Sequence, residues 1–432
     1  MSAAPKTPRH IALDILCRVE RGAYLDRLLD AQREHIRDPD GDLLQHLVRG
    51  TLTFQARIDH ILTPYLKKPL SRQHAKLRNL LRLGVYQLQY LDRVPSYAVV
   101  SESVILARHV LGDPIAKLVN AVLRGVAENR KPVVFPDFDR DPVEYLAIMT
   151  SHPQWLVAQW IKRYGVDETR VLCEFNNAQP ALTIRPNALR TTSDALREQL
   201  ALEGIGTELA ASGLLAVSQV GHLFQSKAYF DGLFSVQGTG AAMVVPLLDP
   251  QPGEAILDLC SAPGGKAIAM AERMKDRGFI LAIDLYPRRL EMLKKNTHRL
   301  GVTCICPLAV DARYLAVNRL FDRVLVDVPC SSLGILNHHP DLRWRKFDIH
   351  GLTRLQRTLL DSAADYVRPG GVLVYSTCTL EPEENERVVE GFLSDHPGFQ
   401  ITHPYLQLLP HQTGNDGVFA VRLKRTTSQA NS

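Results

Sequence analysis

The sequence predicts a multi-domain chain: an all-helical part, then a small α/β subdomain, then a larger doubly wound α/β domain. Its 432 residues correspond to about three domains of typical size. Apolar residues recur at helical spacing through the first 128 residues. Further along the chain, short apolar runs end in an acidic residue, a glycine turn or a cysteine, which is typical of strands in an open α/β sheet.

Composition limits the class of protein. The hydrophobic content of 45% and the charged content of 22% are ordinary for a globular chain. No apolar run approaches the roughly 20 residues of a membrane span, and the start MSAAPKTPRH lacks the apolar region of a secretory signal. The seven cysteines are odd in number and lack zinc-ligand spacing. We therefore expect a cytoplasmic, monomeric protein with no membrane segment and no metal.

Positive charge is concentrated at the start of the chain. Residues 1–130 hold 20 lysines and arginines against 13 acidic residues, a net +7, whereas the remainder is −2 and the whole chain +5. Arg72 and Lys76, and likewise Arg78 and Arg82, are i,i+4 pairs on one stretch. A basic surface of this kind is compatible with nucleic acid, and a solvated basic face explains it equally well.

The first predicted domain, residues 5–128, is a helical bundle. Thr-Pro at 63–64 and Val-Pro at 94–95 interrupt its helices. The tract ENRKPVVFPDFDRDP, with three prolines, predicts a linker over residues 129–143. The apolar positions that define the helices are Ile11, Ile15, Leu16, Val19, Leu43, Leu44, Leu47, Val48, Ile58, Ile61, Leu62, Leu77, Leu80, Leu81, Leu83 and Leu88.

Residues 144–235 are predicted to form the small α/β subdomain. Its stretch ALTIRPN, residues 181–187, is typical of a strand followed by a turn. The side chain of Arg185 in this stretch can pair with a phosphate or can pin a loop to an acidic residue. At the other end of the chain, the tail TTSQANS, residues 426–432, is predicted to be disordered.

The large α/β domain, residues 236–425, begins with AILDLCSAPGGK. Its strand ends at Asp258, a glycine turn follows, and a helix begins near Lys266. Adjacent glycines let the backbone approach a ligand, and the helix N-terminus offers free N–H groups. The next apolar run ends in Asp284, where an acid suits a ribose diol. The absence of a GxGxxG motif makes a dinucleotide a poorer candidate.

Two later strands each lead into a cysteine. FDRVLVD ends at Asp327 and runs into VPCSS, which contains Cys330. VLVYS runs into Thr377 and Cys378. Because open α/β sheets bind ligands at the carboxyl ends of their strands, we expect both thiols near the ligand site.

These motifs resemble a known family. DLCSAPGGK, DVPCSS and YSTCTLEPEENE are similar to the motifs of RNA 5-methylcytosine methyltransferases, which use S-adenosylmethionine. LVRGTL, LRNLLRLGVYQLQYL and LVNAVLRGV resemble the NusB-type RNA-binding bundle. Together they resemble the RsmB (Sun, Fmu) family over nearly the whole chain. The resemblance implies a NusB-like RNA-binding bundle, a small RNA-binding subdomain and a Rossmann-like, S-adenosylmethionine-dependent catalytic domain.

The resemblance also implies roles for the strand-end residues. Cytosine carbon 5 is a poor nucleophile until a thiolate adds to carbon 6 and produces an enamine that takes the methyl group. Cys378 is implied as that nucleophile and Cys330 as the thiol that assists product release. Asp327 would hold the cytosine edge or the methionine end of the cofactor. A buried free thiol is the alternative for each cysteine, and two strand-end thiols in these motifs argue against it.

Further residues are implied to bind the cofactor. Asp284 would hold the ribose, and Asp311 the adenine amine, with surface exposure or helix capping as the alternative for Asp311. Lys266 can neutralise a carboxylate or contact RNA, and Cys260 is assigned to packing rather than attack. The loop implied for the methionine moiety consists of Cys260, Ser261, Ala262, Pro263, Gly264, Gly265 and Lys266.

The implied reaction is methyl transfer to carbon 5 of one cytosine in 16S ribosomal RNA, of the cytosine-967 type, through a covalent Cys–C6 intermediate. The implied partner is free or early-assembly ribosomal RNA. The same chemistry on transfer RNA or another ribosomal cytosine is one alternative. A non-catalytic RNA-binding assembly factor is another, and the intact Cys330, Cys378 and Asp327 argue against it. Ala267, where the family usually has threonine, and Asn337–His338 before HPD leave the target base open.

Overall fold

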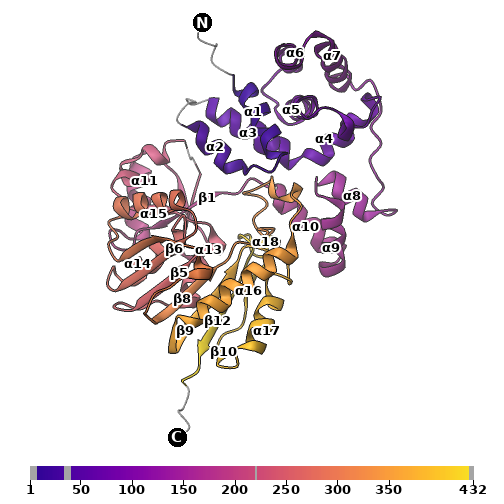
Figure 1. The fold of residues 1–432 in the computed structure, drawn as a ribbon. Coiled ribbons are helices and arrows are strands. Elements are labelled where there is room, and N and C mark those ends of the chain that lie inside the picture. Colours follow the sequence, from indigo (N-terminus) through magenta and orange to yellow (C-terminus); the bar gives the residue numbers. More distant parts are fainter. Residues whose placement is uncertain (1–6, 34–39, 219–220, 428–432) are drawn as a thin grey trace. The chain divides into compact units, whose positions relative to one another are not determined.

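The structure is a computed structural model that describes residues 7–33, 40–218 and 221–427 (Figure 1). The chain forms two compact units. Residues 1–179 and 336–346 form the first, which we call the helical unit. Residues 180–335 and 347–432 form the second, which we call the sheet unit. The predicted disordered tail falls mostly outside the described residues, because the last described residue is 427.

The helical unit is built around α5, Ala75–Tyr90, which packs against α1, α3, α4, α6 and α7. Ten of its residues are buried, so α5 lies in the core rather than on a surface. Thr7 begins α1 by accepting from the His10 N–H, with Pro8 in the first turn. The predicted interruptions are confirmed: Pro64 lies in the 3-10 turn η1 and Pro95 caps α6. The elements of the unit are α1 Pro8–Val19, α2 Leu25–Arg33, α3 Asp40–Thr53, α4 Gln55–Leu62, η1 Thr63–Tyr65, η2 Leu70–Arg72, α5, α6 Ser96–Leu111, α7 Asp113–Ala127, α8 Pro142–Met149, α9 Gln154–Tyr164, α10 Val166–Asn177 and η6 Leu342–Trp344.

The predicted small subdomain is divided between the two units. Helices α8, α9 and α10 belong to the helical unit, whereas the strands that follow residue 180 belong to the sheet unit. These strands form an antiparallel sheet in the order β2-β3-β1-β4 around a core that includes Ile184, Leu200 and Phe234. The elements here are β1 Leu182–Pro186, α11 Ser193–Leu202, β2 Thr207–Leu209, η3 Ala211–Gly213, β3 Leu215–Val217, η4 Leu223–Gln225, α12 Lys227–Phe230 and β4 Phe234–Val236.

The larger sheet has the strand order β10-β12-β9-β8-β5-β6-β7, with β11 paired to β12. Strands β5 to β9 are parallel, and β10, β11 and β12 are antiparallel additions. From β5 the chain moves outward to β6 and β7, then crosses to β8 and β9 on the other side. The order therefore reverses between β5 and β8, which is the switch point at which open α/β sheets bind ligands. The elements are α13 Thr239–Leu248, β5 Ala255–Leu259, α14 Gly265–Arg273, β6 Phe279–Asp284, α15 Pro287–Leu300, β7 Ile305–Ala309, η5 Ala312–Tyr314, β8 Phe321–Asp327, α16 Ile349–Asp365, β9 Val367–Thr377, α17 Glu386–Asp395, β10 Phe399–Ile401, β11 Leu406–Leu408, α18 Pro410–Thr413 and β12 Val418–Arg425.

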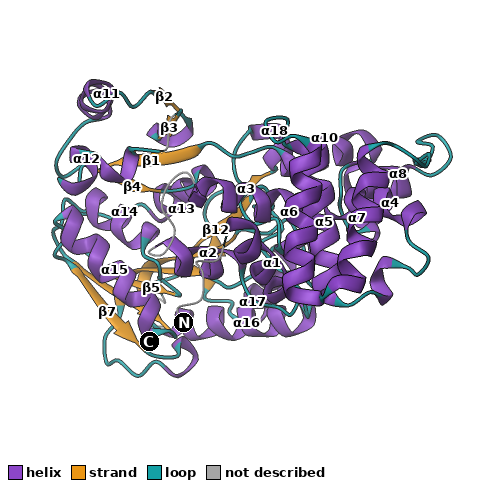
Figure 2. Cartoon of the chain, turned by 90° about the horizontal axis from the view of Figure 1, so that it is seen from above, coloured by secondary structure: helices purple, strands orange, loops and turns teal. Residues whose placement is uncertain are grey.

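Helices cover both faces of this sheet, as Figures 1 and 2 show. Successive strand residues point to opposite faces, so Ile256 and Leu257 enter different cores. One core contains residues of α16 and α17, and the other contains residues of α13, α14 and α15. The predicted fold class, a helical bundle followed by a small α/β part and a Rossmann-like domain, is confirmed.

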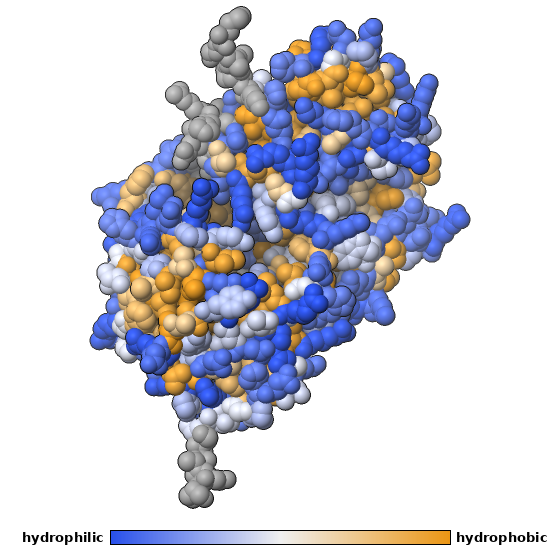
Figure 3. Space-filling model, in the orientation of Figure 1, coloured by the Kyte–Doolittle hydropathy of each residue, from blue (hydrophilic) through white to orange (hydrophobic). Residues whose placement is uncertain are grey.

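Apolar residues are mostly inside these cores. The face drawn in Figure 3 is largely hydrophilic with scattered apolar patches, as is usual for a folded chain. Among the residues the structure describes, no helix has the length and apolar character needed to cross a membrane.

Candidate active site

The predicted catalytic residues and the glycine loop lie at the carboxyl ends of β5, β8 and β9. Asp327 is the last residue of β8 and lies in register with Ser376 of the adjacent parallel strand β9. Cys330 follows β8 by three residues and Cys378 follows β9 directly. Because parallel neighbouring strands end at the same edge, the two motifs arrive side by side, as their spacing predicts.

The two thiols are in contact. The Sγ atoms of Cys330 and Cys378 are 3.4 Å apart, and Ser332 Oγ lies 3.2 Å from Cys378 Sγ. Hydrogen bonding from Cys330, opposed by burial and assisted by Ser332, lowers the pKa of Cys378 below that of an ordinary thiol. The same contact with Cys378, together with burial, raises the pKa of Cys330 well above that value. The pair therefore favours a thiolate on Cys378 and a thiol on Cys330.

A network of buried polar groups holds the backbone on both sides of the cysteines. The carboxylate of Glu384 accepts from the Ser331 N–H at 2.9 Å and from Gln356 Nε2 at 2.8 Å. Gln356 also donates to the Pro329 carbonyl at 3.0 Å. On the other strand, Thr377 Oγ1 donates to Asn385 Oδ1 at 2.6 Å. The segment EPEENE, residues 381–386, thus holds the backbone next to both thiols in place.

Asp327 joins the cysteine pair to the glycine loop. Lys266 Nζ donates to Asp327 Oδ2 at 2.7 Å, and Ser376 Oγ donates to Asp327 Oδ1 at 2.7 Å. Burial disfavours the Lys266 ammonium, but the Asp327 carboxylate more than offsets this, so the pKa of Lys266 is raised. Lys266 therefore remains cationic beside the Cys378 thiol and contributes to lowering its pKa.

A cavity of about 210 Å³ lies next to this ion pair. Asp258 is buried in its wall, and burial, opposed by the neighbouring Ser261 and reinforced by the charge of Asp327, raises the pKa of Asp258 to about 7. Within the described part of the chain, both Asp258 carboxylate oxygens, Ser261 Oγ and Gln237 Nε2 are buried without a hydrogen-bond partner. Buried polar groups are normally paired, so this wall offers donors and acceptors to a polar ligand. The cavity is lined by Val236, Gln237, Gly238, Ala241, Asp258, Cys260, Ser261, Ala262, Pro263, Gly265, Lys266 and Asp327.

The glycine loop owes its shape to two particular contacts. Gly264 has a φ of +101°, and a Cβ there would collide with Leu293, so glycine is required. Arg185 donates to the Gly265 carbonyl at 3.2 Å and pairs with Glu272, Nε to Oε2, at 2.9 Å. Of the two roles left open for Arg185, the structure shows the one that pins a loop to an acid.

The comparisons with known proteins agree with this geometry. Three family models match: the NusB family over residues 6–128, the ferredoxin-like domain of RsmF/B-type methyltransferases over 152–217, and the 16S rRNA methyltransferase RsmB/F over 245–424. The probable ribosomal RNA small subunit methyltransferase B of Bacillus subtilis is 35% identical, over 96% of this chain and 98% of that protein. Its counterpart in Synechocystis is 36% identical, over 96% of this chain and 99% of that protein. The chain belongs to the RsmB/F family.

RsmB/F membership confirms the resemblance on which the site residues were assigned, and methyltransferase membership implies a cofactor of the S-adenosylmethionine type. Two solved structures support the fold. The crystal structure of PH0851 covers 98% of this chain and 100% of its own, with a TM-score of 0.82 and 26% identity. NSun6 from Pyrococcus horikoshii, solved with SFG, covers 65% of this chain and 100% of its own, with a TM-score of 0.58 and 23% identity.

The remaining two acids assigned to the cofactor are engaged with the protein. Asp284 is buried, accepts from the Ala262 N–H at 3.2 Å and pairs with Arg289 at 3.2 Å. Asp311 begins the turn η5 and pairs with Arg313 at 2.6 Å, which is the capping arrangement weighed against its adenine role. Each carboxylate keeps lone pairs for a further donor, so the ribose and adenine roles stay predictions for this RsmB/F chain.

Sequence reasoning missed several residues of this RsmB/F site. Ser332 and Ser376 hydrogen-bond to Cys378 and Asp327, and Asp258, one residue before the end of β5, lines the cavity. An acid at the end of the first strand is a signal that pointed to Asp258. The contacts of Gln237 and Glu384 join residues far apart in the sequence, and no local pattern indicates them.

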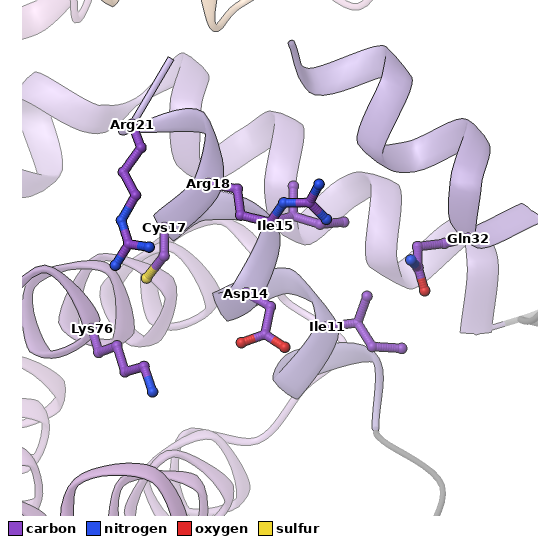
Figure 4. A pocket seen from close by; sticks show the side chains of 8 residues that line it. All are labelled: Ile11, Asp14, Ile15, Cys17, Arg18, Arg21, Gln32 and Lys76. Atoms are coloured by element: carbon purple, nitrogen blue, oxygen red, sulfur yellow. The ribbon is translucent and has the colours of Figure 1, made fainter. Parts of the chain in front are cut away.

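The basic stretch of the NusB-type unit is partly used inside the protein. Arg82 forms two 2.7 Å hydrogen bonds with Asp59, and Arg78 pairs with Glu20. A different pocket, of about 290 Å³, gathers basic side chains from α1, from the turn that follows it and from α5 (Figure 4). The residues that line it are Ile11, Asp14, Ile15, Cys17, Arg18, Arg21, Gln32 and Lys76.

Proposed function

We propose that this chain transfers a methyl group from S-adenosylmethionine to carbon 5 of a cytosine in 16S ribosomal RNA, with the family's cytosine-967 type position as the target. The observation that carries the proposal is the thiol pair, Cys378 Sγ 3.4 Å from Cys330 Sγ, beside Asp327 and the polar cavity. A lowered pKa at one thiol and a raised pKa at its neighbour suit attack by the first and proton handling by the second.

Cys378 attacks carbon 6 of the cytosine as a thiolate, and the electron pair of the ring moves to carbon 5. Once Cys378 is a thiolate, the thiol of Cys330, 3.4 Å from its Sγ, and the hydroxyl of Ser332, 3.2 Å from it, can both donate to that sulfur before attack. S-Adenosylmethionine, when bound, supplies a methyl group on a positively charged sulfur. After transfer, a base removes the carbon 5 proton and the C–S bond breaks, which returns the thiolate to Cys378.

Cys330 suits the release step for an electrostatic reason. Its pKa is raised first by the contact with Cys378, then by burial. Once Cys378 is bonded to carbon, its negative charge is gone, and that contribution to the pKa of Cys330 disappears. Cys330 can then release its proton to water, and the resulting thiolate accepts the proton from carbon 5.

The cavity next to Asp327 suits the amino-acid end of the cofactor. The carboxylate of Asp258 is buried without a partner among the described residues and can accept from an ammonium group. The N–H groups at the start of α14 can donate to a carboxylate. Asp327 favours the cationic sulfonium nearby, while Asp284 and Asp311 are proposed for the ribose and the adenine amine.

The basic pocket of the helical unit is proposed as a contact for RNA phosphates. The side chains of Arg18, Arg21 and Lys76 form no ion pair with any described residue, unlike those of Arg78 and Arg82. Figure 4 shows Arg21 and Lys76 on one side of Cys17, with Arg18 extending toward α2. Three unpaired cations around one hollow suit the negative charge of a nucleic acid backbone.

The names of the relatives indicate ribosomal RNA as the substrate. We propose that the protein is a cytoplasmic monomer and meets this RNA either free or during early ribosome assembly.

The test is to incubate the protein with S-adenosylmethionine and 16S ribosomal RNA and to map 5-methylcytosine by bisulfite sequencing. Modification of one ribosomal cytosine is expected, and a transfer RNA pool should remain unmodified. Modification of transfer RNA instead would mean that the protein carries out the same reaction with transfer RNA as its substrate. No modification of any RNA, with RNA binding intact, would support a non-catalytic assembly factor.

A further inference from the structure

Gln237 contributes a buried donor to the wall of the cavity beside Asp327. The residue lines this cavity together with Asp258 and the glycine loop, and it is itself buried. Its side-chain nitrogen Nε2 makes no hydrogen bond with any residue that the structure describes. A buried N–H group without an acceptor is unfavourable, so Gln237 is complementary to a ligand that brings an acceptor into the cavity.

Arg185 determines which end of the Gln237 amide is available. One terminal nitrogen of its guanidinium donates to Gln237 Oε1. Glu272 holds the rest of the guanidinium, because Nε and the second terminal nitrogen donate to its two carboxylate oxygens at 2.9 and 3.0 Å. The side chains of Arg185 and Glu272 are 13% and 4% exposed. Since a bidentate pair fixes the guanidinium, the amide is held with Oε1 on Arg185, and Nε2 is left for a ligand.

Strand β1 also holds the backbone of Gln237. The Gln237 N–H donates to the Thr183 carbonyl at 3.2 Å, and Thr183 Oγ1 donates to the Gln237 carbonyl at 2.6 Å. Thr183 and Arg185 both belong to β1, and Gln237 directly follows β4, the antiparallel partner of β1. These residues and the glycine loop lie within the sheet unit. Backbone and side chain are thus preorganised, so binding requires little further ordering of Gln237.

The unpartnered groups of the cavity wall are of opposite kinds. Gln237 Nε2 can only donate, whereas the carboxylate of Asp258 is an acceptor that can carry a negative charge. The Arg185 nitrogen that donates to Gln237 also donates to the Gly265 carbonyl at 3.2 Å. Gly265 begins α14, where the helix dipole favours a negative charge. A zwitterion, with an ammonium for Asp258 and a carboxylate for Gln237, would satisfy both kinds of group.

We infer that Gln237 binds the carboxylate of the cofactor's methionine end through Nε2, and that Arg185 is the positioning residue that orients its amide. This inference rests on the proposed S-adenosylmethionine site and assigns residues of the small antiparallel sheet to cofactor selection. It distinguishes Gln237 from Asp258, because each recognises a different end of the same zwitterion. A ligand that keeps the adenosine and the ammonium but lacks the carboxylate should therefore gain nothing from Gln237.

The test measures the binding of three adenosyl thioethers to the full-length protein by calorimetry, without RNA and without turnover. S-Adenosylhomocysteine carries the ammonium and the carboxylate, its decarboxylated analogue carries the ammonium alone, and methylthioadenosine carries neither. Gln237→Glu keeps the shape of the side chain and an acceptor for Arg185, but replaces the donor with an anion. Affinity for S-adenosylhomocysteine should fall about 10- to 100-fold. The decarboxylated analogue should bind at least as tightly as to wild type, and methylthioadenosine within about twofold.

Two further variants separate the roles. Asp258→Asn should weaken both ligands that carry an ammonium. Arg185→Lys keeps a cation for Glu272 but lacks the fork that also holds Gln237, so it should reproduce the carboxylate-selective loss to a smaller extent, about 3- to 10-fold. Equal weakening of all three ligands by Arg185→Lys would contradict its positioning role.

The inference is overturned if Gln237→Glu weakens all three ligands equally, which indicates a structural role, or weakens none of them. Failure of the wild type to bind S-adenosylhomocysteine would overturn the proposed cofactor together with this inference. Failure of the proposed RNA reaction would leave this readout unchanged, because the binding measurement involves no RNA.

Discussion

The cysteine side of the site and the side proposed for the cofactor differ in how their polar groups are satisfied. Around Cys330 and Cys378, the side chains of Ser331, Gln356 and Glu384 are hydrogen-bonded to one another or to nearby backbone. In the cavity, the carboxylate of Asp258 is buried without a partner among the described residues. The polar groups of the first region are satisfied by the protein itself, whereas the second leaves buried polar atoms available to a ligand. Substitutions on the cysteine side should therefore alter the rate of methyl transfer. Substitutions in the cavity should alter the affinity for the cofactor.

The largest effects should come from the thiol pair, where the two cysteines should fail differently. Cys378→Ser replaces a thiolate with a hydroxyl of far higher pKa, so methyl transfer should fall at least about 1,000-fold and no RNA adduct should form. Cys330→Ala keeps the nucleophile and removes the proton acceptor, so a protein–RNA adduct should accumulate. The adduct is measured as a band by denaturing electrophoresis after incubation with cofactor and RNA. A retarded band from Cys378→Ser but not from Cys330→Ala would reverse the assignment.

On the cofactor side, Asp258→Asn should weaken binding without weakening the fold. Loss of the anion should reduce S-adenosylmethionine affinity roughly 10- to 100-fold by calorimetry, since a charged hydrogen bond is removed. The pKa of Asp258 is raised to about 7 from 3.8, so the folded state binds this proton more tightly than the unfolded state does. The carboxyl therefore lowers the stability of the wild type progressively as pH rises from about 4 to 7, by up to about 4 kcal/mol.

Asp258→Asn should remove that part of the pH dependence and should not lower the unfolding temperature at pH 7. Asp284→Ala is the matched control, because Asp284 is equally buried but is bonded to Ala262 and Arg289. It should lower both affinity and unfolding temperature. Equal affinity of Asp284→Ala and wild type would remove Asp284 from the ribose role. A loss of stability in Asp258→Asn as large as that in Asp284→Ala would contradict the contrast between paired and unpaired groups.

The sequence predicted the residues on the cysteine side of the site more completely than the contacts that hold those residues in place. The positions of Cys330, Cys378 and Asp327 follow from strand ends, because a strand's end is a local property, whereas their roles came from the family resemblance. The supporting contacts are not local: the carboxylate of Glu384 accepts from the N–H of Ser331, 53 positions away in the chain. Neither hydrophobic periodicity nor the prolines on either side of residues 336–346 indicate that this segment belongs to the helical unit rather than the sheet unit. The basic stretch shows the same limit, since pairing of Arg78 and Arg82 depends on distant acids.

The contrast between paired and unpaired groups extends to the basic residues of the helical unit. Combined substitution of Arg18, Arg21 and Lys76 by glutamine should weaken RNA binding and flatten its salt dependence, because fewer counterions are released. A slope smaller by about 1 to 3, from filter binding between low and moderate salt, is the expected change. Substituting the paired Arg78 and Arg82 should lower the unfolding temperature with little effect on the slope. Equal slopes in the pocket variant and wild type would make the pocket a solvated face.

The smallest effect should come from Ser332, which contributes one hydrogen bond to Cys378, the proposed nucleophile. Its Oγ lies 3.2 Å from Cys378 Sγ, and this bond lowers the pKa of Cys378 after the larger contribution of Cys330 and against that of burial. Ser332→Ala removes a donor to the thiolate and not to the thiol, so the pKa of Cys378 should rise. At a pH below that pKa, the thiolate fraction and the rate of attack should both fall, and at high pH both should recover. Alkylation of Cys378 across pH should therefore show a profile displaced upward by about half a unit, with an unchanged plateau. A lower plateau without displacement would mean that Ser332 supports the loop rather than the charge on sulfur.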